Sequence, residues 1–356
     1  MRAAVYYGQQ DVRIEDRPEQ ALGPDDVRLD VGGAGICGSD LHEYVAGPIF
    51  VPTDEPHSLT GETAPVTMGH EFSGVVSAVG ENVTTLSTGD RVAVNPILSC
   101  GDCRYCNTGR QNICESLGFI GLSGGGGGFA EQSVVPAQNA IPLADGMSLA
   151  EGALIEPFSV GVHAVRQAEL QLGDDVVVTG AGPIGLTVVQ SARAAGARRI
   201  FVSEPNENRR QLARDSGADV TVDPTEESLE TVVTAETDVG ADVGFEVSGV
   251  EPALNQVVQS TKRGGHTTVV SVFEDRAEMD PNDVSMMERS MNGTRAYHGG
   301  ARSRDDYETA IGMLDAGHFD GDSLITDRIG LDEIVESGFE KLIGDKSSVK
   351  IIVEQE

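Results

Sequence analysis

Basic residues are scarce in this sequence, which has 25 lysines and arginines against 57 aspartates and glutamates and a formal net charge of −32. Only four of the 25 are lysines. A chain this negative repels nucleic acid and anionic membranes, so neither is expected as a partner. A lysine-poor acidic chain also favours a halophilic protein, because concentrated salt screens the self-repulsion. The alternative is an ordinary acidic mesophilic protein.

Long apolar runs are absent as well. No stretch approaches the roughly 18 apolar residues that a membrane helix needs. The first residues, "MRAAVYYGQQDVRIEDR", lack the apolar core of a secretory signal. We therefore expect a cytoplasmic protein without a membrane segment. Its 356 residues, 39% of them hydrophobic, suffice for two globular domains.

Cysteine is rare, and four of the five cysteines lie in the stretch "CGDCRYCNTGRQNIC": Cys100, Cys103, Cys106 and Cys114. Two-residue spacings strain a disulfide, and a cytoplasmic protein seldom carries one. Four closely spaced thiolates can instead enclose one tetrahedral zinc ion. An iron–sulfur cluster is the rival, but the long last gap and the absence of a Cys-Pro pair weigh against it. Because four thiolates leave no open coordination position, this predicted zinc is structural.

The fifth cysteine, Cys37, lies in "GICGSDLH" and is followed by His70 and Glu71 in "GHEFSG" and by Glu156 in "LIEPFSV". Cysteine, histidine and carboxylate are the donors of a catalytic zinc that keeps one position open. Each residue alone has a commoner structural explanation, such as burial in a core. Their occurrence in one chain with the four-cysteine loop and a cofactor turn favours a second, catalytic zinc.

The stretch "DDVVVTGAGPIGLTVVQSARAAGA" indicates a strand, a glycine-rich turn and a helix. The free N–H groups at such a helix start bind a dinucleotide pyrophosphate. The predicted cofactor-binding residues of this turn are Gly180, Gly182, Pro183, Ile184 and Gly185.

Glu204 ends the next predicted strand, 24 residues after the first glycine of the turn. A carboxylate at this spacing accepts hydrogen bonds from both ribose hydroxyls and repels a 2′-phosphate, which favours NAD over NADP. Arg209 and Arg210 follow within reach. An exposed helix face explains both arginines, and Arg209 is kept as a further candidate cofactor contact.

Strand-like runs alternate with helix-permissive stretches from residue 157 to 296, which predicts a parallel sheet of the Rossmann type. Residues 1–156 form a β-rich segment that carries both sets of metal donors. The fold class is therefore α/β, with two domains. The glycine run at 124–128 has no helix after it, and we interpret it as a flexible turn that leads into a strand.

The order of these motifs resembles the zinc-dependent medium-chain alcohol dehydrogenase family over essentially the whole chain. The resemblance implies a GroES-like catalytic domain to which residues 297–356 return. It also implies that Cys37 and His70 hold the catalytic zinc, with Glu71 behind it and Glu156 completing the shell directly or through water. Ser39 would take the proton of the alcohol, and His42 would pass it through the cofactor ribose to solvent. A helix cap at Ser39 and Asp40 is compatible with this role.

Two loop segments, 43–69 with "GPIF" and "SLTG" and 117–131 with the glycine run, resemble the butanediol dehydrogenase branch of this family. This resemblance implies NAD-linked interconversion of a vicinal diol with a hydroxyketone, by a homo-oligomer that is a dimer or a tetramer. His57, Tyr44 and Phe119 are additional candidates for the substrate pocket. The alternatives are a threonine 3-dehydrogenase, a sorbitol-type polyol dehydrogenase and, from another class, a non-catalytic dinucleotide-binding protein. The metal donors disfavour a zinc-free quinone reductase.

Overall fold

The computed structural model describes residues 1–298, 303–345 and 347–355, and the chain divides into two compact units. Unit 1 comprises Met1–Glu156, His298–Asp315 and Ile325–Glu356, and unit 2 comprises Pro157–Tyr297 and Ala316–Leu324. The short segment Ala316–Leu324 thus groups with unit 2, although it lies within the 297–356 region expected to return to the first domain. No helix in the described ranges is long and apolar enough to cross a membrane.

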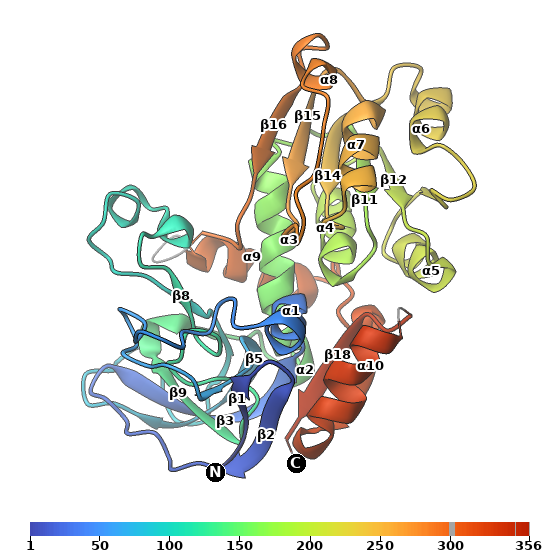
Figure 1. The fold of residues 1–356 in the computed structure, drawn as a ribbon. Helices are drawn as coiled ribbons and strands as arrows, with labels where there is room; N and C mark the ends of the chain where they lie inside the picture. Colours follow the sequence, from blue (N-terminus) through green and yellow to red (C-terminus); the bar gives the residue numbers. More distant parts are fainter. Residues whose placement is uncertain (299–302, 346, 356) are drawn as a thin grey trace. The chain divides into compact units, whose positions relative to one another are not determined.

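Unit 2 is built on a six-stranded sheet in the order β13-β12-β11-β14-β15-β16. All five neighbouring pairs are parallel, which confirms the predicted Rossmann-type sheet. Helices α4 and α5 contact each other and strand β12, and helices α6 and α7 contact each other and strand β14 (Figure 1). The strands are β11 (Asp175–Thr179), β12 (Arg199–Ser203), β13 (Val220–Val222), β14 (Ala241–Glu246), β15 (Thr261–Val269) and β16 (Ser290–Gly293). The helices are α4 (Pro183–Ala194), α5 (Glu207–Asp215), α6 (Leu229–Thr237), α7 (Glu251–Ser260) and α8 (Asn282–Ser285), and α3 (Ile155–Gln167) begins in unit 1.

Unit 1 is rich in β-strands. Its larger sheet has the order β10-β6-β5-β3-β18-β17, with β9 also paired to β3. These strands are β3 (Asp26–Gly35), β5 (Glu71–Val79), β6 (Arg91–Val94), β9 (Gln132–Pro136), β10 (Ala140–Pro142), β17 (Ile325–Gly330) and β18 (Lys350–Glu354). Smaller sheets join β1 (Arg2–Gly8) to β2 (Asp11–Asp16) and β4 (Val66–Thr67), and β7 (Ile97–Leu98) to β8 (Gly118–Phe119). The helices are α1 (Gly38–Ala46), α2 (Leu149–Ala153), α9 (Ser303–Asp315) and α10 (Lys341–Gly344).

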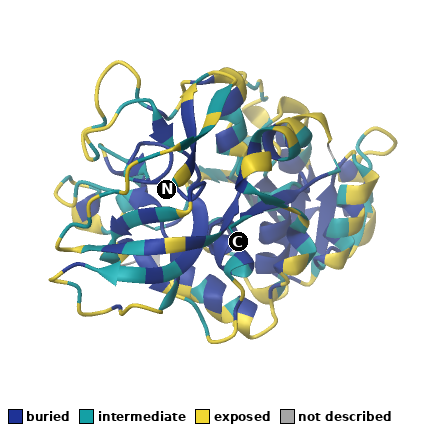
Figure 2. Cartoon of the chain, turned by 90° about the horizontal axis from the view of Figure 1, so that it is seen from below, coloured by how far each residue is buried: buried dark blue, intermediate teal, exposed yellow. Residues whose placement is uncertain are grey.

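Each unit has its own hydrophobic core. In unit 2, the central strand β11 is buried at all five positions, as expected for a parallel strand covered on both faces. In unit 1, the core cluster includes Tyr44, Phe72, Phe129 and Phe339. Figure 2 shows the buried positions concentrated in the strands and the helix faces against them, whereas the exposed positions lie mainly in loops and turns.

The glycine run at 124–128 differs from the predicted flexible turn, because its backbone is packed closely against neighbouring segments. A Cβ atom at Gly128 would lie 2.4 Å from Phe72 Cβ, and one at Gly127 would lie 2.4 Å from the carbonyl oxygens of Thr67 and Met68. The run therefore needs glycine so that two backbones can approach each other. The strand predicted after it is present as β9.

Candidate active site

The four clustered cysteines bring their sulfur atoms together. Cys100 Sγ lies 3.5 Å from Cys114 Sγ and 3.9 Å from Cys106 Sγ, and Cys103 Sγ lies 3.9 Å from Cys114 Sγ. Ligands about 2.3 Å from a tetrahedral zinc ion lie about 3.8 Å apart, so these separations fit one zinc ion. The cysteines are free, which is consistent with metal ligation and excludes the disulfide alternative.

Backbone N–H groups of this loop point at the sulfur atoms. The N–H groups of Cys100, Cys103 and Cys106 donate to sulfur atoms of the cluster at 3.3–3.5 Å. Backbone hydrogen bonds, first that from the Cys106 N–H, lower the pKa of Cys103 to about 6. In contrast, the side chain of Asp102 raises the pKa of Cys100 to about 12, and burial raises the pKa of Cys106. Donors that point at sulfur stabilise its charged form, which is the form that binds a metal. The residues present therefore fit a structural zinc ion enclosed by four thiolates.

The second donor set is assembled by adjacent strands of the larger sheet in unit 1. Strand β3 ends one residue before Ile36, and Cys37 follows as the N-cap of α1. Gly35 pairs with Glu71, the first residue of β5, so that Glu71 and His70 are brought beside Cys37. The ligand atoms of Cys37, His70 and Glu71 lie within 4.8 Å of one another. Cys37 is 33 residues from His70 in the sequence, and the register of β3 with β5 brings it beside the consecutive pair His70 and Glu71.

His70 is oriented by a residue that was not predicted to belong to the site. Its Nδ1 lies 3.3 Å from Asp40 Oδ1, and both side chains are buried. Asp40 also accepts a hydrogen bond from the Cys37 N–H at 2.9 Å, so it contacts both donor residues. With Nδ1 facing a carboxylate, Nε2 is the nitrogen left for a metal. Burial lowers the pKa of His70, but the charges of Asp40 and Cys37 outweigh it and raise this pKa well above its ordinary value.

Ser39 and His42 share helix α1 with the cysteine at its start. Ser39 Oγ lies 3.0 Å from His70 Nε2, which places this hydroxyl beside the nitrogen that faces the donor set. His42 lies on the same helix and is half-buried. Glu156 is buried in the first turn of α3. It is not among the three residues whose ligand atoms come together, and its role as a further ligand stays a prediction.

Lys350 is the most unexpected residue of this region. It is 1% exposed, and its Nζ donates to both carboxylate oxygens of Glu71 at 2.9 and 2.6 Å and to the Ile36 carbonyl at 3.1 Å. Burial lowers the pKa of Lys350, but the charge of Glu71, followed by that of Cys37, raises it above its ordinary value. The ammonium group thus neutralises Glu71 and ties it to the residue that precedes Cys37. The available signal was a lone lysine at the start of the apolar run "KIIV".

The predicted cofactor turn is present in unit 2. Strand β11 ends at Thr179, and Gly182 is the N-cap of α4, with Pro183 as its first residue. A Cβ atom at Gly185 would lie 2.1 Å from the Gly180 carbonyl oxygen, so only glycine allows this helix to start so close to the turn. A Cβ atom at Gly182 would meet open space, which leaves room for a pyrophosphate at the helix start.

Glu204 lies directly after β12, next to this turn. Its two carboxylate oxygens accept hydrogen bonds from the N–H groups of Ala181 at 2.9 Å and Asn206 at 3.0 Å. Arg210 donates to the Glu204 carbonyl at 2.7 Å and pairs with Asp223 at 2.9 Å. Arg209 is half-buried on α5, and its backbone N–H donates to Asn206, so its role toward a cofactor stays a prediction.

The three residues suggested for the substrate pocket have structural contacts. Tyr44 is 6% exposed and packs on Phe339, with 5.2 Å between their ring centroids. His57 lies 3.3 Å from the Leu117 carbonyl oxygen and connects the two loop segments that resemble the butanediol dehydrogenase branch. Phe119 is half-buried against the core of unit 1. Tyr44 therefore belongs to the core, and His57 stabilises a loop.

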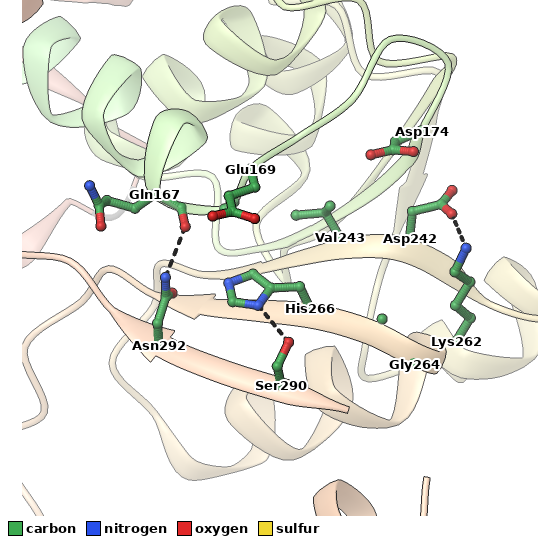
Figure 3. A pocket seen from close by; sticks show the side chains of 12 residues that line it. Gln167, Glu169, Asp174, Asp242, Val243, Lys262, Gly264, His266, Ser290 and Asn292 are labelled. Carbon is green, nitrogen blue, oxygen red and sulfur yellow. Dashed lines mark hydrogen bonds and ion pairs between the residues drawn. The ribbon is translucent and has the colours of Figure 1, made fainter. Parts of the chain in front are cut away.

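A cavity of about 410 Å³ lies at the other end of the unit 2 sheet from the cofactor turn, where β14 and β16 begin (Figure 3). Its polar side chains are partnered: Asp242 with Lys262, His266 with Ser290, and Asn292 with the Gln167 carbonyl. In a parallel α/β sheet, ligands bind beyond the carboxyl ends of the strands. We assign no cofactor to this cavity.

Comparison with known proteins agrees with this geometry. Residues 23–145 match the family "Alcohol dehydrogenase GroES-like domain", and residues 183–316 match the family "Zinc-binding dehydrogenase". A (R,R)-butanediol dehydrogenase of Bacillus subtilis is 45% identical over 354 residues, which cover 99% of each chain. The chain belongs to the zinc-dependent medium-chain alcohol dehydrogenases. It is therefore an oxidoreductase that acts on CH–OH groups.

A further relative and a solved structure also match this alcohol dehydrogenase over nearly its full length. A (R,R)-butanediol dehydrogenase of Neisseria gonorrhoeae is 40% identical, with 99% of each chain covered. The crystal structure of 2R,3R-butanediol dehydrogenase from Bacillus subtilis matches with a TM-score of 0.93 and 43% identity, and it covers 100% of this chain and 99% of that one. The family and the fold class predicted from the sequence are confirmed.

Proposed function

We propose that this protein is a zinc-dependent, NAD-linked dehydrogenase that interconverts a vicinal diol and a hydroxyketone, such as 2,3-butanediol and acetoin. The observation that carries the proposal is full-length similarity to two butanediol dehydrogenases in a chain whose Cys37, His70 and Ser39 meet in one site. Sequence similarity suggests the substrate. Cys37 and His70, with the Ser39 hydroxyl beside them, supply the metal ligands and the proton acceptor that its oxidation needs.

In this proposal, Cys37 and His70 hold the zinc ion, and Glu156 completes the shell. When bound there, zinc acts as a Lewis acid and lowers the pKa of the alcohol towards neutrality. Ser39 orients the alcohol proton and accepts it, and His42, on the same helix, passes it towards solvent. Asp40 holds His70 with Nε2 available, and Lys350 keeps Glu71 neutralised. The turn at Gly180–Gly185 would bind the pyrophosphate of NAD, which would supply the hydride acceptor.

Glu204 supports NAD rather than NADP as the cofactor. Its carboxylate lies at the end of β12 and is 2.9 Å from a backbone N–H of the glycine-rich turn. In that position it can accept hydrogen bonds from the ribose hydroxyls, and it repels a 2′-phosphate. The half-buried Arg209 nearby is a further cofactor contact in this proposal.

Replacing Glu204 with alanine should relax this preference. The variant loses the hydrogen bonds to the ribose and the repulsion of the 2′-phosphate, so kcat/KM for NAD should fall about tenfold or more while that for NADP rises. Steady-state kinetics with each cofactor measures the ratio. Glu207→Ala is a matched control, because Glu207 is an exposed carboxylate three residues further along the chain. An unchanged NAD/NADP ratio in Glu204→Ala would remove this residue from the ribose site.

The proposed substrate is tested by NADH formation in high potassium chloride with 2,3-butanediol, threonine and sorbitol side by side. Turnover of butanediol should exceed that of threonine and sorbitol by at least about tenfold. A single contact in a substrate pocket typically changes kcat/KM by about this factor. Turnover of threonine or sorbitol instead would keep the metal chemistry and reject the diol assignment. Activity that rises with salt would support the halophilic origin predicted from the charge.

We also infer a cytoplasmic location and a homo-oligomeric state. The two predicted sets of zinc-binding cysteines support a reducing compartment, because thiols must stay reduced to bind the metal. The oligomer is a dimer or a tetramer in this proposal, and light scattering coupled to gel filtration would distinguish them. Its partner is a small alcohol, and neither nucleic acid nor membrane is part of the proposed function.

A further inference from the structure

Glu43 is a buried carboxylate that the proposed chemistry does not use. It lies on α1 and is 0% exposed. Its partners are three successive backbone N–H groups: Ile49 donates to Oε1 at 3.0 Å and to Oε2 at 3.1 Å, Phe50 to Oε2 at 2.8 Å, and Val51 to Oε1 at 3.3 Å. Burying a charge is costly unless hydrogen bonds compensate for it. Here the compensating donors all belong to the loop that follows the helix.

The position of Glu43 on the helix places this loop near the proposed alcohol site. Ser39 and Glu43 are four residues apart, so their side chains lie on the same face of α1, one helical turn apart. Ser39 Oγ contacts His70 Nε2 at 3.0 Å. The Glu43 carboxylate, which holds this backbone, therefore projects from the helix about one turn beyond the Ser39 hydroxyl.

The captured segment is apolar and is anchored at its far end as well. Residues 47–52 read "GPIFVP" and carry no hydrogen-bonding side chain. Val51 is buried in the core of unit 1, whereas Ile49 is 50% exposed. Further along the same loop, Thr60 donates to the Ser123 carbonyl at 2.6 Å, and Glu62 accepts from the Gly125 N–H at 3.2 Å. The segment itself is held at its end by the Pro52 carbonyl, which accepts a hydrogen bond from the Ala64 N–H at 2.8 Å.

The buried carboxylate of Glu43 also raises the pKa of Tyr6, which lies beside Gly47. Tyr6 is 0% exposed, and a Cβ atom at Gly47 would lie 2.3 Å from its hydroxyl oxygen. Burial, followed by the charge of Glu43, raises the pKa of Tyr6 to about 12. Gly47, the first residue of the captured segment, is therefore buried against Tyr6 beside Glu43.

We propose that Glu43 is a positioning residue that fixes Ile49 and Phe50 as an apolar wall of the alcohol site, and that this wall selects short vicinal diols over polyols. The inference rests on the proposed function. A short diol presents carbon to such a wall. A polyol would instead place hydroxyl groups against side chains that offer no hydrogen bond, and an unpaired hydroxyl is strongly disfavoured.

The experiment compares kcat/KM for 2,3-butanediol and for sorbitol in the wild-type enzyme, Glu43→Gln and Ile49→Ala. In Glu43→Gln an amide donor replaces one of the two accepting oxygens and releases the loop. Ile49→Ala removes the wall directly at a half-exposed position. Both variants should lower the butanediol/sorbitol ratio at least about tenfold. Zinc content and NADH affinity should remain at wild-type values.

Amide hydrogen exchange provides a second readout. It should become faster at Ile49, Phe50 and Val51 in Glu43→Gln and stay unchanged near His70. Two control variants should keep the wild-type substrate ratio. Glu131→Gln alters an exposed carboxylate that accepts a single N–H, from Arg2 at 2.8 Å, and Val27→Ala weakens the core of the same unit.

The substrate ratio decides between the outcomes. Faster exchange with an unchanged ratio would show that Glu43 only stabilises a loop and would overturn the proposal. If Glu43→Gln does not fold, an unchanged ratio in Ile49→Ala overturns it alone. A wild-type preference for sorbitol would contradict the diol assignment itself and the wall with it, and it would be seen before any variant is made.

Discussion

Cys37→Ser is expected to abolish turnover and leave the fold intact, whereas the main effect of Cys103→Ser should be a loss of stability. Cys37 belongs to the donor set beside Ser39, and Cys103 belongs to the closed set of four thiolates. Without the catalytic metal, nothing lowers the pKa of the alcohol towards neutrality, so kcat should fall by at least about 10³-fold. The two substitutions are matched, because each replaces one sulfur atom with oxygen.

Cys103→Ser should lower stability because its loop depends on the zinc ion and on hydrogen bonds to sulfur. Residues 100–114 contain only two short 3-10 turns, and hydrogen bonds to sulfur connect their backbone. A structural zinc ion contributes its binding free energy to folding. A loss of about 3 kcal/mol would lower the melting temperature of a unit this large by about 6–12 °C.

Zinc analysis, calorimetry and kinetics on both variants provide the measurements. Each variant should retain one zinc ion per chain, but only Cys103→Ser should show the lowered melting temperature. Equal unfolding of the two variants would contradict the division into a catalytic and a structural metal. Cys103→Ser with full stability would show that the loop does not depend on its zinc ion.

The metal donors could be predicted from the sequence because they are local or chemically distinctive. Cysteines two residues apart must lie within reach of one ion, whatever the surrounding fold. The turn at Gly180–Gly185 is equally local, since its strand, glycines and helix are consecutive in the chain. The alternation of strand-like runs with helix-permissive stretches then sufficed to predict the Rossmann-type sheet.

Contacts that depend on strand register could not be predicted from the sequence, because they join residues that are far apart in the chain. Lys350 and Glu71 are 279 residues apart, and they meet only because β18 and β5 both lie next to β3. Glu43 has no pattern that predicts its role, because its partners are backbone N–H groups of a loop. The tail segment 331–343 has helical spacing, yet the structure forms a π-helix at Ile334–Glu340 between a 3-10 turn and α10.

Lys350→Met is expected to be the most destabilising single substitution at the site. Its ammonium group is 1% exposed and is paired with a carboxylate that is 0% exposed, so removing it leaves an uncompensated buried charge. Breaking one partner of a buried pair costs about 3–5 kcal/mol. Lys350→Arg should keep part of that stability, since it restores the charge. The double variant Glu71→Gln, Lys350→Met should also recover most of it, because both charges are then gone.

The control is Lys341→Met, which removes an ammonium group paired with Asp327 at 2.6 Å but 36% exposed. An exposed pair contributes at most about 1 kcal/mol, so this variant should unfold almost as the wild-type enzyme does. Urea unfolding at matched salt measures all four variants. If Lys350→Met and Lys341→Met lose the same stability, burial does not determine how much the Lys350–Glu71 pair contributes to the free energy of unfolding. If the double variant is no more stable than Lys350→Met, the cost arises from the cavity that the lysine leaves, and Glu71 tolerates the loss of its partner.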